Sequence, residues 1–304
     1  MIADHFAQAI AAAGLVPPDT IHADGQLYRF SATGKRSDSA GWYVLHADGL
    51  PAGVFGCWRT GLTETWCSKA ESTLTPAERQ MLLEKVRAAQ RQRDAEKMLI
   101  HQQAGHSAML RWRFAQPATE HPYLAAKGVK AHGLRADSRR LLVPLRDTSG
   151  TLTSLQTIYP NGSKRLFPGG RVTGCYHAIG TLGCVLVLAE GYATGATIHE
   201  ATGLPVAVAF NAGNLLAVAR TLRRKFPALP IVLAADDDHT TEGNPGLTAA
   251  RAAALAVGGL VAVPQFPADR PPKATDFNDL FSLAGSNAVR ACFAEVMEGL
   301  DHGH

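Results

Sequence analysis

The spacing of apolar residues changes along the chain and divides it into two parts of different character. Between residues 26 and 70, short runs of aromatic and β-branched residues are interrupted by glycines. This pattern predicts a small module of antiparallel strands joined by tight turns. From residue 184 onwards, near-continuous apolar runs are separated by longer helical segments. Such an alternation predicts a parallel sheet that helices cover on both faces.

The later part of the chain contains several expected elements. Strands are expected at 184–189, 206–210, 231–235 and 260–263, and helices at 194–201, 214–226 and 246–257. Asn214 stands just before an apolar run and is expected to be the N-cap of the second of these helices. Upstream, residues 139–167 are expected to form strands joined by turns at Ser149-Gly150 and Asn161-Gly162.

Two further helices are expected in the first part of the chain. One covers residues 3–13 and ends at Gly14. The other begins at Thr75, followed by proline at the first helical position and by Glu78, which completes a capping box. It continues to about Phe114 with many Arg, Gln and Ala residues, so it is expected to be a polar connector between modules.

Composition excludes several classes of protein. The chain has 304 residues, of which 46% are hydrophobic and 18% charged, as in soluble globular proteins. Its five cysteines are scattered without a C-x-x-C pair, which argues against a zinc ribbon or a disulfide scaffold and favours a reducing cytoplasm. The first residues do not resemble a signal peptide, and no apolar run approaches the ~18 residues of a membrane span. A cytoplasmic protein without a membrane partner is expected.

Acidic residues follow three of the expected strands. Glu190 comes after the first strand, Asp236-Asp237-Asp238 after the third, and Asp276-Phe277-Asn278-Asp279 after the last. One such group could cap a helix or line a turn, but in a parallel sheet the strand ends meet at one edge, where sites form. Carboxylates without thiols or imidazoles suit Mg²⁺ or Mn²⁺. We therefore expect a site for two or more such ions, a type that serves phosphoryl transfer.

The three consecutive aspartates are expected to differ in role. If strand geometry persists, Asp236 and Asp238 point to the same side and Asp237 points away. Asp236 and Asp238 are thus the expected metal ligands. Glu190 is a candidate for metal binding or for proton transfer, and the residues themselves do not separate these roles.

Basic residues are concentrated between Lys127 and Arg171. Nine of them stand against two acidic residues there, a net charge of +7 in a chain whose net charge is +4. Such a segment is either a solvated face or a groove for nucleic-acid phosphates. Beside a metal site for nucleotide chemistry, we favour the groove.

Several motifs together resemble a known family. E-G-Y at 190–192 and D-x-D at 236–238 with the downstream Gly246 look like the Toprim domain of bacterial-type primases, topoisomerases and some nucleases. The segments LAEGYATGATIHEATG, AVAFNAGNL, NPGLTAAR and TDFNDL are similar to the primase part of primase–helicases from phage satellites, plasmids and integrative elements. The resemblance covers residues 120–283. It implies catalytic roles for Glu190, Asp236 and Asp238 and metal binding that extends to Asp276 and Asp279.

The resemblance extends upstream into the basic segment. HPYLAAKGV and RLLVPLRDTSGTLTSLQTIYPNGSKRLFPGG look like the basic subdomain that precedes Toprim in replicative primases. It implies that Arg146 and Lys164 face template and nucleotide, and we add Arg140 and Arg165 to this surface. Asn211, in the N-A-G turn, is either a nucleotide contact or a plain turn residue.

The chain departs from replicative primases at two places. Their third acidic motif resembles D-x-D, whereas here Asn278 stands between Asp276 and Asp279. Their amino-terminal zinc module is also absent, since Cys57 and Cys67 have no further cysteine partners nearby. We therefore expect no zinc and interpret both cysteines as core residues of the β-rich module.

The expected fold is α/β, with a Toprim-type parallel sheet covered by helices, a basic α+β subdomain before it and a small β-rich module at the start. The expected divisions are a helix plus β-module at 1–74, a connector helix at 75–115, the basic subdomain at 116–180, the Toprim domain at 181–285, and a C-terminal helix and tail at 286–304.

The expected function is synthesis of RNA primers on single-stranded DNA from ribonucleoside triphosphates, in replication of a mobile element or phage. A helicase, fused or separate, is a candidate partner, because the chain has no Walker motif. Two alternatives are a Toprim nuclease and a non-catalytic module that binds single-stranded DNA. In the first module, four aromatic residues either stack DNA bases or form the core: Trp42, Tyr43, Trp58 and Trp66.

Overall fold

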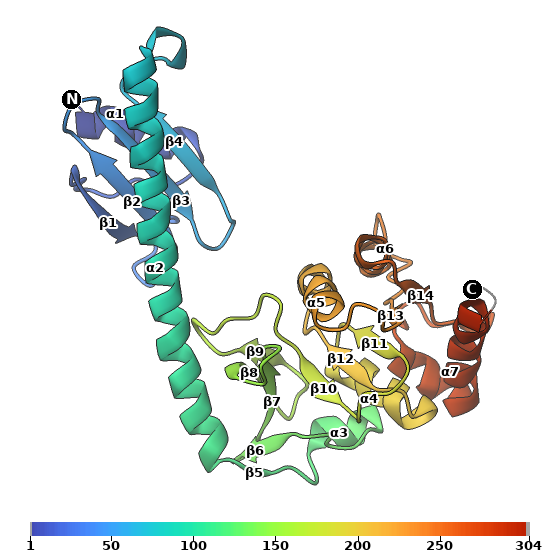
Figure 1. The fold of residues 1–304 in the computed structure, drawn as a ribbon. Helices are drawn as coiled ribbons and strands as arrows, with labels where there is room; N and C mark the ends of the chain where they lie inside the picture. Colours follow the sequence, from blue (N-terminus) through green and yellow to red (C-terminus); the bar gives the residue numbers. More distant parts are fainter. Residues whose placement is uncertain (1, 302–304) are drawn as a thin grey trace. The chain divides into compact units, whose positions relative to one another are not determined.

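A computed structural model describes residues 2–301 and divides them into two compact units, with the boundary between Leu99 and Ile100 (Figure 1). His302 and His304, which the sequence suggests are tail, lie outside the described residues. Each unit has its own sheets and its own apolar core, and each is described by itself.

The first unit is a four-stranded antiparallel sheet between two helices. Its strands follow one another in the order β1–β2–β3–β4. They are β1 (Asp24–Phe30), β2 (Gly41–His46), β3 (Ala52–Cys57) and β4 (Thr63–Cys67), preceded by helix α1 (Ile2–Ala12). Phe6 of α1 packs on Tyr43 and Phe55 on one face, while Ala89 of helix α2 (Pro76–Phe114) packs on Trp42 and Val54 on the other. The predicted module of antiparallel strands is confirmed.

Burial settles the role of two of the aromatic residues in this module. Trp42 and Tyr43 are each only 1% exposed, so they form the core and do not offer a surface for stacking bases. Successive side chains of a strand point to opposite faces, and here both faces are covered by helices. Of the two alternatives for the aromatic residues, the core is therefore confirmed for Trp42 and Tyr43.

Helix α2 (Pro76–Phe114) begins where the capping residues predict. The Thr75 hydroxyl accepts a hydrogen bond from the Glu78 N–H at 3.2 Å, and the Glu78 carboxylate accepts one from the Thr75 N–H at 2.9 Å. This reciprocal arrangement satisfies two N–H groups that would otherwise lack partners. A short 3-10 turn, Glu71–Thr73, precedes the helix. In the second unit, Ala108 and Trp112 of α2 pack on Leu142 and Leu155.

The second unit begins with an antiparallel sheet in the order β5–β6–β7–β8–β9. The elements are β5 (Gln116–Pro117), α3 (Pro122–Lys127), β6 (Arg135–Asp137), β7 (Arg140–Arg146), β8 (Leu152–Ile158) and β9 (Lys164–Leu166). The predicted turns contain Gly150 at φ 85° and Gly162 at φ 82°, values that glycine adopts without steric cost. These turns are confirmed, whereas β5, β6 and α3 are too short to leave a periodic signal.

A mixed five-stranded sheet follows, in the order β10–β12–β11–β13–β14. Its strands are β10 (His177–Ile179), β11 (Leu186–Ala189), β12 (Val206–Val208), β13 (Ile231–Ala234) and β14 (Leu260–Ala262). All neighbours are parallel except β10, which pairs antiparallel with β12 at the edge. The expectation of a parallel sheet holds for four strands and misses β10, because His177–Ile179 does not belong to a continuous apolar run.

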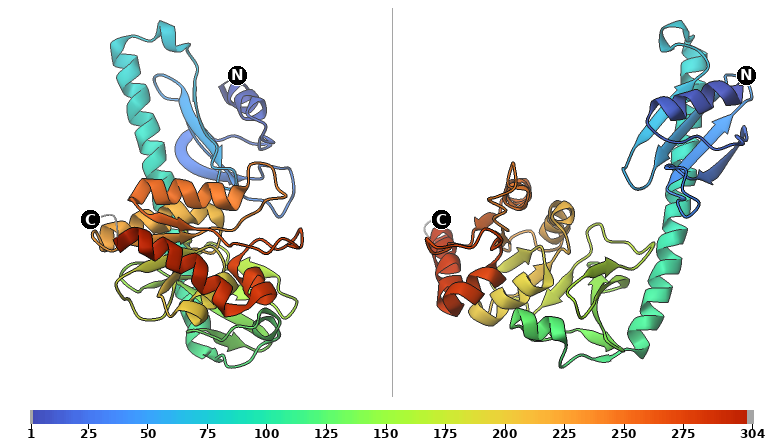
Figure 2. Two further views of the ribbon diagram at one scale, coloured as in Figure 1. Left: turned by 90° about the vertical axis from the view of Figure 1, so that its right-hand side faces the viewer. Right: turned by 180° about the vertical axis from the view of Figure 1, so that it is seen from behind.

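Helices cover both faces of this mixed sheet (Figure 2). They are α4 (Tyr192–Thr202), α5 (Ala212–Lys225), α6 (Pro245–Val257) and α7 (Phe277–Asp301). Leu188 and Leu233 pack with residues of α5 and α6, while the alternate positions Val187 and Val232 pack with residues of α4 and α7. Burial on both faces explains why the strands have near-continuous apolar sequences.

One expected helix cap needs correction. Asn211 is the N-cap of α5, and Asn214 lies inside the helix, where its buried amide donates to the carbonyl groups of Val172, Cys175 and Ala209. The expected C-terminal helix from residue 286 corresponds to the second part of α7, because Gly285, with φ 78°, forms a kink between two helical segments. Among the helices of residues 2–301, none combines the length and the apolar character that crossing a bilayer requires.

Candidate active site

The structure gathers acidic side chains at the carboxyl ends of neighbouring strands. Glu190 directly follows β11, Asp236 follows β13 by one residue, and Asp276 directly precedes α7. The Asp236 carboxyl interacts with the negative charges of Asp276, Glu190 and Asp238, in that order of strength. We call these four residues the carboxylate cluster: Glu190, Asp236, Asp238 and Asp276.

Asp236 is the most perturbed member of the carboxylate cluster. Burial is the main reason that its pKa rises to about 8, and repulsion by the other three carboxylates raises the pKa further, against a smaller effect of Lys164. The residue as a whole is only partly covered, but its Oδ1 atom is buried and has no hydrogen-bond partner among the described residues. A buried oxygen without a donor is costly, and a cation bound beside it would remove that cost.

Glu190 is placed by an unusual turn after β12. Burial raises the pKa of its carboxyl, and a hydrogen bond from the backbone N–H of Ala212 at the start of α5 partly opposes that effect. Phe210 donates its N–H to the Glu190 carbonyl at 2.7 Å and has φ 75°, a value that is rare for a bulky residue. This strained turn directs the first N–H of α5 towards the Glu190 carboxylate.

Asp238 is held by the start of α6. The Gly246 N–H donates to Asp238 Oδ2 at 3.1 Å. A Cβ atom on Gly246 would lie 2.6 Å from the Asp236 carbonyl oxygen and 2.9 Å from Asp238 Oδ2, so no other residue fits without displacement. The close approach also brings the positive end of the α6 dipole to the Asp238 carboxylate.

Asp276 and Asp279 share the start of α7 but face different groups. Asp276 Oδ1 accepts a hydrogen bond from the Asp279 N–H at 2.8 Å, and its Oδ2 accepts one from the Thr194 hydroxyl at 3.1 Å. Asp279 Oδ2 accepts from the Thr275 N–H at 2.9 Å, and its Oδ1 lies 3.9 Å from Lys127 Nζ. Asp276 therefore caps the start of α7 through Oδ1 and also belongs to the carboxylate cluster, while the Asp279 carboxylate bonds back to the backbone before the helix.

Asn278, between these acids, has a packing role. It is 1% exposed, and its amide donates to the Lys127 carbonyl at 2.7 Å and to the Thr197 hydroxyl at 2.9 Å. These bonds tie α7 to α3 and α4. The departure from D-x-D in the sequence thus reflects a buried amide that joins three helices.

Asp237 turns away from the carboxylate cluster. Its carboxylate accepts hydrogen bonds from Arg270 at 2.5 Å and from Asn244 at 2.6 Å. Burial alone would raise the pKa of Asp237, but these two donors hold it below its usual value. The alternation that places Asp237 opposite Asp236 and Asp238 is therefore visible in the partners of the three side chains.

Lys164 is the basic residue that the structure brings to the acids. Its ammonium lies over the Tyr123 ring at 5.6 Å, and a Cβ on Gly191 would be 3.9 Å from Lys164 Nζ. Although the side chain keeps exposed surface, protein atoms crowd its ammonium and lower the Lys164 pKa, and the charge of Lys127 adds to this effect. The acids Asp276, Glu190 and Asp236 act in the opposite direction.

The other residues expected to bind nucleic acid occupy different places. The Arg146 guanidinium lies 5.9 Å from the centre of the Trp112 ring, Arg140 pairs with Asp137 at 3.0 Å, and Arg165 lies over a tyrosine ring. Asn211 directly precedes the Ala212 N–H that bonds Glu190. Of the five expected residues, Lys164 and Asn211 thus lie beside the carboxylate cluster, and the three arginines lie on β7 and β9.

Sequence reasoning did not anticipate several contacts to the acids. Thr194, Tyr123 and Arg270 all act on them, and none stands in a pattern that identifies its partner. The segment HPYLAAKGV, which contains Tyr123, resembles a family segment but carries no local signal of a contact with the acids.

The donor set fits a particular kind of ion site. Among the described residues, no three His, Cys, Asp or Glu side chains are arranged so that they could together hold a metal ion. Mg²⁺, however, usually binds through one or two carboxylates and keeps water or substrate phosphates as further ligands. The buried Asp236 Oδ1 and the neighbouring carboxylates therefore fit an ion that substrate helps to bind, and do not fit a closed all-protein cage.

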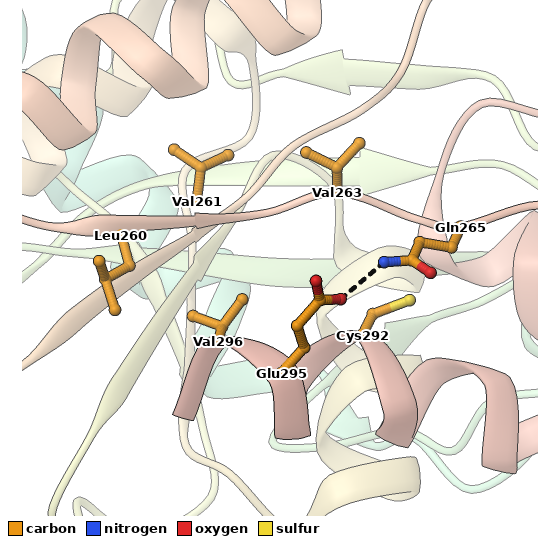
Figure 3. A pocket seen from close by; sticks show the side chains of 7 residues that line it. All are labelled: Leu260, Val261, Val263, Gln265, Cys292, Glu295 and Val296. Carbon is orange, nitrogen blue, oxygen red and sulfur yellow. Dashed lines mark hydrogen bonds between the residues drawn. The ribbon is translucent and has the colours of Figure 1, made fainter. Parts of the chain in front are cut away.

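A separate concavity lies between β14 and α7 (Figure 3). It has a volume of about 390 Å³ and is closed on one side by a hydrogen bond of 2.7 Å from Gln265 to Glu295. No member of the carboxylate cluster lines it. The lining is mainly aliphatic, so this concavity does not share the chemistry of the strand ends.

Comparison with known proteins agrees with the site's composition. Residues 185–287 match the family model of the Toprim domain. Two proteins of Escherichia coli, each called DNA primase TraC, are 36% and 35% identical to this chain over 293 and 284 residues, or 88% and 86% of it. These matches cover 28% and 19% of the two relatives, so the chain spans less than a third of the length of either.

Solved structures show a weaker likeness. The DnaG primase catalytic domain bound to ssDNA is 14% identical, with a TM-score of 0.42 over 66% of this chain and 80% of that one. Residues 185–287 are a Toprim domain, and the chain is a homologue of the DNA primases called TraC.

Proposed function

We propose that this chain is a DNA primase, which joins ribonucleotides on a single-stranded DNA template and releases pyrophosphate. The observation that carries the proposal is the carboxylate cluster in a Toprim domain, with the buried and unpartnered oxygen of Asp236 at its centre. Similarity to TraC over 88% of the chain supports primer synthesis above hydrolysis of nucleic acid. We further propose that the protein acts in the cytoplasm, in replication of a mobile element or phage, with a fused or separate helicase.

Glu190, Asp236 and Asp238 would hold two or more Mg²⁺ or Mn²⁺ ions, with Asp276 beside them. When bound, such ions stabilise the charge that develops on the attacking and leaving oxygens during phosphoryl transfer. Asp236 keeps its proton at neutral pH until a cation replaces it, because its pKa is about 8. Asp279, whose carboxylate accepts a hydrogen bond from the Thr275 N–H, is the weakest candidate ligand of these five acids.

We propose that the basic residues bind different ligands according to their positions. Lys164, beside Gly191 and the acids, would bind phosphate oxygens of the incoming nucleotide. Asn211, at the start of α5, would orient the same nucleotide. Arg140, Arg146 and Arg165, on β7 and β9, would bind template phosphates and set its path.

The first unit is proposed to help engage the template or the initiating nucleotide. Two unlinked nucleotides are held by few contacts, so initiation needs a preorganised site. Trp58 is partly exposed, and its neighbour Arg59 as well as Lys35 and Arg36 are exposed. We propose that this unit works without zinc. Cys57 lies opposite Gly41 and Cys67 opposite Ala52, so they stand at opposite ends of β3 and β4, about 17 Å apart along the strands.

One assay separates this function from its alternatives. The protein is incubated with single-stranded DNA, labelled ribonucleotides and Mg²⁺ or Mn²⁺, and products are resolved by size. Short new oligonucleotides support a primase, and shortened template indicates a Toprim nuclease. Retained binding with neither product indicates a non-catalytic module.

A further inference from the structure

One arginine side chain joins two segments that carry members of the carboxylate cluster. Arg270 donates from Nη1 to Asp237 Oδ2 at 2.5 Å and from Nη2 to the Asp237 carbonyl at 2.7 Å. Its Nε donates to the Ala274 carbonyl at 2.8 Å. The guanidinium thus bridges the end of β13, which carries Asp236 and Asp238, and the residues just before Asp276.

Neighbouring bonds make this bridge a compact network. The Asp237 N–H donates to the Thr275 carbonyl at 2.7 Å, so the same two segments are also joined through backbone. Asn244 donates to Asp237 Oδ1 and accepts from the Asp238 N–H at 2.9 Å. The Arg270 guanidinium lies 4.0 Å from the centre of the Phe266 ring, which fixes its plane.

The segment that Arg270 holds has little structure of its own. Residues 263–276, between β14 and α7, form neither helix nor strand. They end at Asp276, so contacts of this segment with other elements decide how it approaches the strand ends that carry Asp236 and Asp238. The Arg270 and Asp237 side chains are only 16% and 19% exposed, so their ion pair is protected from solvent screening.

We propose that Arg270 is a positioning residue, paired with Asp237, which holds Asp276 at a fixed distance from Asp236 and Asp238. The middle aspartate of the three is then an anchor for the third acidic segment and not a ligand. The inference rests on the proposed divalent-ion site for its consequence, because preordering this segment reduces the entropy that ion binding must otherwise overcome.

The test compares Arg270→Ala, Arg270→Lys and Asp237→Asn in the full chain. Mn²⁺ affinity is measured by calorimetry, and hydrogen exchange is followed over residues 263–276 without metal. We expect Arg270→Ala to weaken Mn²⁺ binding about tenfold and to speed exchange in this segment. Lysine keeps the charge but cannot form three directed bonds, so Arg270→Lys should restore only part of both effects. Arg251→Ala, an exposed position on α6, is the matched control.

A double variant tests whether the two residues act together. If Arg270 acts through Asp237, the loss in Arg270→Ala/Asp237→Asn is smaller than the product of the single losses. Unchanged exchange and affinity in Arg270→Ala would overturn the proposal, as would independent effects of the two residues. If the unaltered chain binds no Mn²⁺, with or without a ribonucleoside triphosphate, the proposed ion site fails instead, and hydrogen exchange still decides whether Arg270 holds the segment. Should Arg270→Ala not fold, the same comparison is made with Arg270→Lys.

Discussion

The surroundings of acidic residues shift their pKa values in opposite directions in the first unit and in the Toprim domain. In the first unit, Glu78 has its pKa lowered to about 2 by a hydrogen bond from Lys69 and by the Thr75 cap. Asp38 likewise has a lowered pKa, because backbone N–H groups and Arg59 surround it. In the Toprim domain, burial and neighbouring carboxylates raise the pKa values of Glu190 and Asp236.

The difference separates acids that stabilise a fold from acids that are available for chemistry. A carboxylate with its own base or cap is stabilised by the protein that surrounds it. A group of carboxylates without enough bases destabilises the protein until a cation binds, which is common at functional sites. The same difference occurs within the triplet Asp236-Asp237-Asp238, because Asp237 is paired with Arg270 and its two neighbours have no such arginine.

The largest expected effect comes from removing one acid of the carboxylate cluster. Asp236→Asn or Asp238→Asn should lower primer synthesis on the order of a thousandfold or more, because charge on the transferring phosphoryl group loses its stabilisation. Fold and single-stranded DNA binding should persist, as checked by circular dichroism and fluorescence anisotropy. Asp237→Asn should be much milder. Equal loss in Asp237→Asn would show that the division of roles among the three aspartates is wrong.

Removal of the first unit should have the next largest effect. A shortened chain that begins at Ile100 keeps residues 108–115, which cover Leu142 and Leu155. It should extend a supplied primer but lose most initiation without a primer, on the order of tenfold or more, since starting requires the most preorganisation. Both reactions are measured on the same template. Initiation equal to that of the whole chain would assign the first unit to another partner.

The full chain also permits a test for zinc. A chelator that binds Zn²⁺ and spares Mg²⁺ should leave initiation unchanged. Loss of initiation that added Zn²⁺ restores would contradict our interpretation of Cys57 and Cys67.

The metal-free protein should lose stability as pH rises. The pKa of Asp236 is about 8 in the folded state and near 3.8 when unfolded, so the folded state holds the proton more tightly between these values. Its contribution to the free energy of unfolding therefore falls from pH 4 to pH 8, by up to a few kcal/mol. Urea titrations of the unaltered chain and Asp236→Asn should converge at low pH and diverge at pH 8. A constant difference between them would contradict the raised pKa.

The smallest expected effect concerns the salt dependence of DNA binding. Arg146→Ala should reduce the slope of log K against log salt by roughly 0.7, the value for one lost phosphate contact on a single strand, whereas Lys164→Ala, at the proposed nucleotide position, should leave the slope nearly unchanged. Anisotropy titrations at several salt concentrations give the slope. Arg220→Ala, exposed on α5, is a better control than a base such as Arg93, whose guanidinium lies over Trp42. An equal change in Arg220→Ala would indicate general basicity.

Much of this fold follows from residues that are close in sequence. The start of α2 at Thr75, the turns at Gly150 and Gly162 and four strands of the mixed sheet could all be predicted, because caps, turns and apolar runs act over a few residues. Because these signals are local, the sequence also predicts that Glu190, Asp236 and Asp276 lie at strand or helix ends. A parallel sheet brings such residues to one edge.

The tertiary structure decided which partner each polar side chain has. Thr194 bonds Asp276 across 82 residues, and Arg270 bonds Asp237 across 33, and neither separation leaves a periodic trace. For the same reason, the sequence pattern predicts that Asn214 is a helix cap, whereas its amide is buried and bonds the Cys175 carbonyl. Local propensities determine where elements begin and end, whereas the role of a buried polar group depends on the donors and charges that packing brings to it.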